Sequence, residues 1–84
     1  SGGRQEKQER KERFFRFHNA ILEGYLQQMS GDKNTLFKMK ELWAYWGENF
    51  ADADRHLKKI RKCERVAEYE CLVDALFREK ELRV

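Results

Sequence analysis

Proline and long apolar runs are both absent from this 84-residue chain. The lack of proline, the small number of β-branched residues and a charged fraction of 39% favour helices over strands. No apolar run approaches the roughly 20 residues that a membrane-spanning helix needs. The N-terminus also lacks the apolar core of a signal peptide. We therefore expect a soluble, cytoplasmic protein with no membrane partner.

Cysteine and histidine are scarce, with two residues of each. Cys63 and Cys71 are too few for a disulfide scaffold and indicate reduced thiols. A zinc site needs about four ligands, and these cysteines do not stand at ligand spacing from His18 or His56. A Cys–His nucleophilic pair would also need an orienting group and an oxyanion site, and no motif marks either. We expect no active site, no metal and no cofactor in this chain.

The length allows one domain at most, and a chain this short buries only about 60% of its unfolded surface. Residues 1–3 have the composition of an expression scar or a flexible lead. Residues 4–84 then form a single helical domain. Because the core is small and the chain does not begin with methionine, we expect a domain excised from a longer protein.

Residues 36–50 supply the strongest helical pattern. Apolar side chains recur there at spacings of three and four, which places them on one side of a helix; these are Leu36, Met39, Trp43, Trp46 and Phe50. Aromatic side chains bury about 150–250 Å² each, so this helix should dominate the core. We interpret it as the central helix of an all-α four-helix bundle with a long first helix. The four helices are predicted at about residues 5–29, 34–48, 53–63 and 65–79.

Phe37 and Tyr45 project from the other side of the central helix. A central helix in a bundle touches several neighbours, so we expect the first or fourth helix to cover both rings. The alternatives are that they stack on an unpaired base or dock a partner domain. Residues 78–84 are charged and are expected to fray.

Short polar and glycine-containing stretches mark the ends of the helices. Gly31 is suited to the left-handed position after the first helix. Asp32 or Asn34 is then expected to cap the second helix, and Asp52 the third. Gly24 lies inside the first helix, where the close approach of another helix would explain it.

Residues 55–65 carry a cluster of basic side chains. Six bases and one acid give this stretch a net charge of +5, against +3 for the whole chain. Arg55, Lys58, Lys59 and Lys62 fall together on the side of the third helix opposite its apolar residues. Such a stripe is typical of a nucleic-acid contact, although an ordinary solvated helix face is the alternative. Clustering of a single sign favours the nucleic-acid interpretation.

Three segments together resemble a known family. These are residues 40–45 (Lys-Glu-Leu-Trp-Ala-Tyr), residues 50–53 (Phe-Ala-Asp-Ala) with the basic helix after them, and residues 16–18 (Arg-Phe-His) with Tyr25. They are similar to the C-terminal helical domain of bacterial tRNA-dihydrouridine synthases over roughly residues 14–77. Many members place the tryptophan directly before the tyrosine, whereas Ala44 separates them here.

The resemblance implies a division of labour. In that family a flavin-binding barrel uses FMN to reduce a uridine of tRNA, an oxidoreductase step of tRNA processing, and the helical domain grips the tRNA. The barrel, the FMN and the catalytic cysteine would lie outside this chain, in the same parent polypeptide. The RNA contacts carried over by position are Lys40, Arg55, Lys58, Lys59 and Lys62. The alternative function is a helical protein–protein interaction module that binds no nucleic acid.

Overall fold

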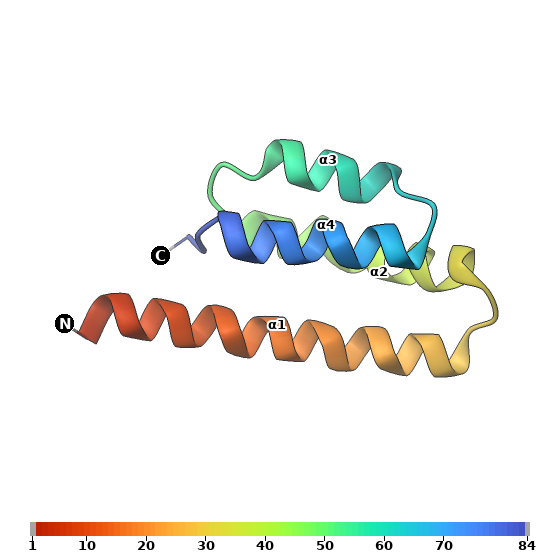
Figure 1. The fold of residues 1–84 in the computed structure, drawn as a ribbon, viewed down its shortest axis with the longest axis horizontal. Coiled ribbons are helices and arrows are strands. Elements are labelled where there is room, and N and C mark those ends of the chain that lie inside the picture. Colours follow the sequence, from red (N-terminus) through yellow and green to blue (C-terminus); the bar gives the residue numbers. More distant parts are fainter. Residues whose placement is uncertain (1, 84) are drawn as a thin grey trace.

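The computed structural model describes residues 2–83 and shows an all-α helical bundle (Figure 1). Its helices are α1 (Gly2–Gln28), α2 (Asp32–Trp46), α3 (Asp54–Lys62) and α4 (Val66–Glu79), with a short 3-10 helix, η1 (Gly47–Asn49), after α2. This confirms the predicted class and the long first helix, and every predicted helix end is within three residues of the observed one. Ser1 and Val84, the outermost residues of the predicted lead and tail, lie outside the described residues.

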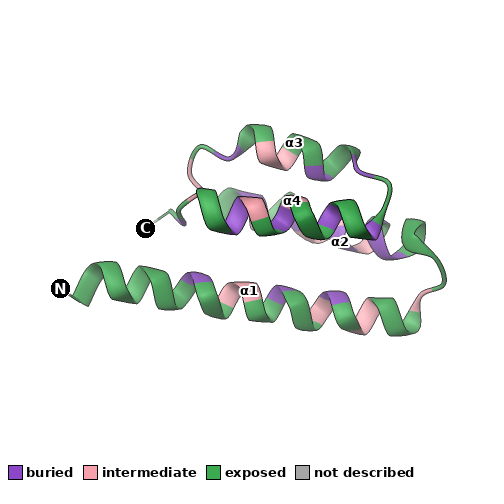
Figure 2. Cartoon of the chain, viewed as in Figure 1, coloured by how far each residue is buried: buried purple, intermediate pink, exposed green. Residues whose placement is uncertain are grey.

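The helices are layered around α2 and α4. α1 runs along one side of this pair, and α3 packs against α4 on the other (Figure 1). Buried positions on α1, α2 and α4 face one another, whereas α3 is mostly exposed (Figure 2). Gly2 and Gly3, predicted to belong to an expression scar or a flexible lead, form part of the first turn of α1.

The predicted apolar stripe of α2 is the centre of the core. Met39 and Trp43 are buried, Trp46 is half-buried, and Phe50 beyond η1 is almost fully enclosed. Phe14 of α1 joins the aromatic residues into one cluster, with ring centroids 5.3–6.5 Å from four neighbouring rings. Such pairs add about 0.5–1.5 kcal/mol each beyond the burial of their surface.

The helix starts differ from the prediction. Gly31 has the expected positive φ, of 82°, but neither predicted side chain caps α2. The Asp32 carboxylate instead accepts a hydrogen bond from the backbone N–H of Val66, at 3.0 Å, and so satisfies the first residue of α4. Asn34 donates its side-chain amide to the carbonyl of Ser30 at 2.9 Å.

Asp52 does not cap α3 either. The residue before α3 is Ala53, and Asp52 takes up a turn with φ of 53°, a conformation that aspartate tolerates better than most residues. Gly24 has no neighbouring atom within 4 Å of the place where a Cβ would stand, so the close approach predicted there is wrong. The close approach occurs at Gly47, where a Cβ would lie 2.9 Å from Leu57.

The C-terminal segment, defined here as residues 80–83, does not fray as predicted. Leu82 is only 8% exposed and forms an isolated antiparallel bridge with Phe50. The backbone N–H of Ala51 donates to the carbonyl of Glu81 at 2.9 Å. From α1, Lys11 donates to the carbonyl of Lys80 at 3.1 Å and is itself 8% exposed. The segment therefore holds the start of α1 against the end of α2.

Replacing Leu82 with alanine tests this attachment. We expect Leu82→Ala to lower the free energy of unfolding by about 2–4 kcal/mol, because a buried side chain is lost and the site cannot fully collapse. Urea denaturation followed by circular dichroism measures the change. Arg78→Ala, at an exposed position of α4, is the control and should change it by less than about 0.5 kcal/mol. Equal values for the two variants would show that the segment is not anchored.

Candidate nucleic-acid interface

The basic face of α3 consists of Arg55, Lys58, Lys59 and Lys62, and all four are exposed. The opposite side of the helix is fixed by the core, since Ile60 is fully buried and Leu57 is half-buried. α3 packs against α4 and α2, which leaves its basic face turned outward (Figure 2). The structure thus brings together the four α3 residues that the sequence selected.

The charges of the basic face are not neutralised inside the molecule. Within residues 2–83, none of its four side chains forms an ion pair, and the acids that do form one pair with Lys11, His56 and Arg78. Part of the clustering has a local cause, because cations in the last turn of α3 suit the negative end of the helix dipole. Arg55 lies at the other end of the helix, where the dipole gives no such reason for a cation.

Lys40 occupies a different environment. Its ammonium donates to the carbonyl of Cys63 at 2.6 Å, and the residue is half-buried. Cys63 is the residue that follows α3, so Lys40 satisfies a carbonyl that the end of the helix leaves free. Lys40 therefore ties α2 to the end of α3, and the outward positive charge comes from α3 itself.

The exposed aromatic residues of α2 differ from expectation. Phe37 is 62% exposed and Tyr45 is 76% exposed, so the prediction that another helix covers them is wrong. α1, α3 and α4 all pack against other sides of α2, because its apolar stripe is wide enough to contact all three helices. Both rings remain accessible to a base or to a partner protein.

His18 lies in a buried polar network. Its Nε2 is 2.6 Å from the Tyr69 hydroxyl, which also accepts a hydrogen bond from the Trp43 indole N–H at 2.7 Å. The side-chain oxygen of Asn19, 2.9 Å from Nδ1, can only accept, so Nδ1 carries the proton of the neutral ring. Nε2 is then an acceptor, and the Tyr69 hydroxyl donates to it. Every polar atom of the imidazole is used, and His18 is 1% exposed. Its role is structural, because no substrate can reach the ring.

The thiols also lack catalytic features. Burial raises the pKa of Cys63, an effect that the nearby Lys40 partly offsets, and the thiol donates to the carbonyl of Ile60. A raised pKa disfavours the thiolate, which is the nucleophilic form. Cys71 is exposed on α4. Across residues 2–83, no three side chains of His, Cys, Asp and Glu are grouped to hold a metal ion.

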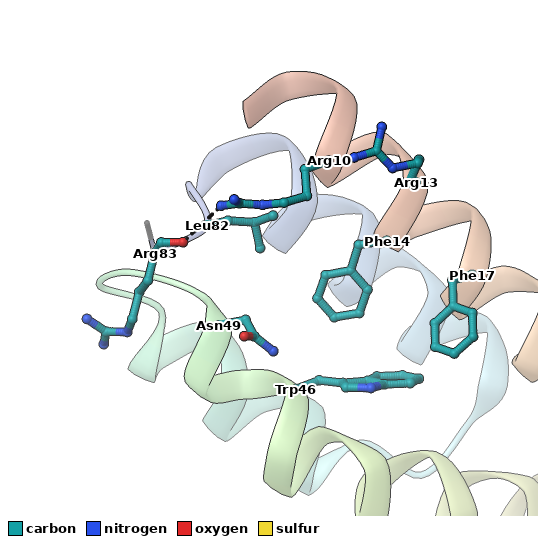
Figure 3. A pocket seen from close by; sticks show the side chains of 8 residues that line it. All are labelled: Arg10, Arg13, Phe14, Phe17, Trp46, Asn49, Leu82 and Arg83. Carbon is teal, nitrogen blue, oxygen red and sulfur yellow. Dashed lines mark hydrogen bonds between the residues drawn. The ribbon is translucent and has the colours of Figure 1, made fainter. Parts of the chain in front are cut away.

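A second surface was missed by the sequence reasoning. A groove of about 610 Å³ lies between α1, η1 and the C-terminal segment (Figure 3). Arginine and aromatic side chains line it. Those on α1 recur at spacings of three and four, and this spacing is the one feature of the sequence that indicates the groove. The remaining walls come from the end of α2, from η1 and from the C-terminal segment, at least 29 residues away from the lining residues of α1.

The His18 network predicts a loss of stability in mild acid. Burial lowers the pKa of His18 below its usual 6.5, against smaller raising effects of Asn19 and Asp74. Below pH 6.5, His18 is therefore protonated in the unfolded chain but stays neutral in the folded chain until the pH reaches its lower folded-state pKa. The free energy of unfolding falls as the pH drops through this range. One such proton changes the unfolding free energy by at most about 1.4 kcal/mol per pH unit.

Denaturant titrations from about pH 7.5 to about pH 5 measure this loss. His18→Gln retains an acceptor for Tyr69 but has no titrating group, so its stability should depend less on pH than that of the parent. Parallel pH profiles for the two proteins would contradict the assignment of a neutral, buried His18.

None of the four helices described within residues 2–83 is both long enough and apolar enough to cross a membrane. Comparisons with protein-family models, with curated proteins and with solved structures found no match. The function of the chain is therefore inferred from its own residues and from the geometry of its two cationic surfaces.

Proposed function

We propose that this chain is the tRNA-binding helical domain of a cytoplasmic, FMN-dependent tRNA-dihydrouridine synthase. The observation that carries the proposal is the basic face of α3, whose four cations are exposed and have no ion-pair partner within residues 2–83. The sequence resemblance over residues 14–77 supports the choice of tRNA as the polyanion. The reductive chemistry would belong to the barrel domain, and no residue of this chain is assigned to the flavin.

The geometry of the basic face suits phosphates rather than bases. Its residues lie at spacings of three and four along two turns of α3, so their charges spread over about 10 Å of the helix axis. Flexible lysine side chains act as point charges that adapt to a phosphate backbone. Such contacts position a folded RNA with little reading of its sequence.

The role of the domain in the reaction follows from this mode of binding. A uridine in folded tRNA must leave its stack before an enzyme can reach its ring. A domain that holds the tRNA backbone fixes where the extruded uridine arrives. The basic face would thus position the substrate for a barrel that carries out the reduction.

A protein-interaction module is the second candidate. The exposed rings of Phe37 and Tyr45 favour it, because large exposed aromatic side chains often mark a docking surface. In this second candidate the two rings contact a partner protein, and the chain binds no nucleic acid. The two candidates differ in their response to salt, since apolar docking is nearly independent of salt and phosphate binding is not.

Charge reversal on α3 tests the proposal. We expect Lys58→Glu combined with Lys59→Glu to weaken tRNA binding several-fold, with the helical circular-dichroism signal unchanged, because both side chains are exposed. If four cations contact phosphates, the slope of log K against log salt for the parent is roughly −3 to −3.6. The variant should lose about two units of that slope. Filter binding or fluorescence anisotropy between about 50 and about 200 mM salt gives both quantities.

The matched control has the same charge change away from α3. Lys7→Glu combined with Lys33→Glu alters two exposed lysines of α1 and α2 and should retain most of the affinity. Equal tRNA affinity for the α3 variant and the parent would refute the role of the basic face. Equal weakening by both pairs would show that only net charge matters.

A further inference from the structure

The groove beside α1 has an aromatic floor. The indole of Trp46 is packed edge-on by Phe14 at 5.6 Å and by Trp43 at 5.4 Å, so its orientation is fixed. Phe17 lies 6.2 Å from the same indole and is 56% exposed. Figure 3 shows the face of Trp46 turned toward Phe14 and Phe17 across the groove. A planar group that enters the groove meets the exposed ring of Phe17 and the part of the half-buried Trp46 indole that Phe14 leaves uncovered.

The rim of the groove is cationic. Arg10 and Arg13 line it with their side chains, whereas the guanidinium of Arg83 points away from the groove in Figure 3 and its Nε donates to the carbonyl of Glu48 at 3.0 Å. The part of the chain that the structure describes contributes no carboxylate side chain to the lining. The guanidinium of Arg10 is held by a hydrogen bond to the carbonyl of Arg83 at 3.0 Å. Arg13 has no hydrogen bond or ion pair from its side chain to residues 2–83, which leaves its planar donors for a ligand. Guanidinium groups of this kind match the geometry of phosphate oxygens.

Asn49 supplies a polar group at one end of the floor. Its backbone carbonyl accepts a hydrogen bond from the N–H of Arg83 at 2.7 Å, which fixes the position of the residue. Its side-chain amide points into the groove in Figure 3 and has no hydrogen-bond partner within residues 2–83. An amide offers both a donor and an acceptor, the pair that the edge of a nucleobase can satisfy.

We propose that this groove binds one unstacked nucleotide of single-stranded RNA. The base packs on the exposed ring of Phe17 and the uncovered part of the Trp46 indole, its edge meets the amide of Asn49, and its phosphate meets Arg13. The volume of about 610 Å³ is within the range of small-ligand sites. Stacking of one base on an aromatic side chain contributes about 1–3 kcal/mol. This inference rests on the proposed function in that both assign RNA as the partner, but it uses a different surface, since α1 and α3 lie on opposite sides of α4 (Figure 1).

The charge of the rim favours a nucleotide over a protein segment. An apolar peptide would cover the aromatic floor but would leave the guanidinium of Arg13 next to a ligand without counter-charge. Desolvating a charge without a partner is unfavourable. A nucleotide can contact both parts of the groove, because its base packs on the aromatic floor and its phosphate pairs with the guanidinium of Arg13.

Fluorine NMR of the chain labelled with 5-fluorotryptophan tests the groove, because the chain has two tryptophans and gives two signals. Trp46→Phe assigns them. On titration with hexauridylate, the Trp46 signal should shift and the buried Trp43 signal should change little. Arg13→Gln should weaken this binding about five- to tenfold. Arg16→Gln, on the same helix but outside the groove lining, is the control and should bind like the parent.

The arms of the experiment separate this inference from the proposed function. The variant with Lys58→Glu and Lys59→Glu should keep the shift of Trp46 with hexauridylate while it loses affinity for tRNA. If that shift persists and the α3 variant binds tRNA as the parent does, the proposed function fails and the groove assignment stands. Absence of a Trp46 shift at saturating oligonucleotide, or equal affinity of Arg13→Gln and the parent, overturns the groove assignment. A shift caused by an apolar peptide and not by RNA overturns it in favour of a protein partner.

Discussion

The hydroxyl of Tyr69 joins three helices at the centre of the bundle. It donates to His18 of α1 and accepts from Trp43 of α2, at 2.6 and 2.7 Å, while its own backbone belongs to α4. A buried hydroxyl without partners is costly, so each helix can rotate or slide only by breaking one of these bonds. The hydroxyl therefore fixes the relative register of α1, α2 and α4. Burial raises the pKa of Tyr69, and the tyrosine stays protonated as the network requires.

Both cationic surfaces depend on that register. α4 presents the surface on which α3 rests, and Ile60 of α3 is buried there, which directs the basic face outward. On the other side, the position of α1 places Phe17 beside Trp46 at the groove. The fold acts as a rigid support that holds two sets of cations in fixed positions.

Much of the fold could be predicted because it follows from local periodicity. The spacing of Leu36, Met39 and Trp43 determines one face of a helix whatever surrounds it, and the basic face of α3 follows from the same rule. The helix caps could not be predicted in this way. Asp32 is the first residue of α2, but its carboxylate accepts a hydrogen bond from Val66 of α4, 34 residues away. That choice depends on how the helices pack, which the local sequence does not encode.

Charge and exposure misled the prediction in two other places. Residues 80–83 are highly charged, yet the backbone of this segment is paired and Leu82 is buried, so composition alone indicated the wrong state. Phe37 and Tyr45 are apolar enough to suggest a covering helix, but α1, α3 and α4 pack against other sides of α2. The groove could not be predicted at all, because its walls come from three separate segments.

The bond between Arg10 and Arg83 has a consequence for folding. It links residues 73 positions apart, and Lys11 and Lys80 are joined across a similar distance. Contacts at such separations close late, because a long loop must first be ordered. On the ribosome, the helices can begin to form while the chain is being made, but the groove needs Leu82 and Arg83, which emerge after all four helices. An unfinished chain would therefore carry a basic α3 before it carries a groove.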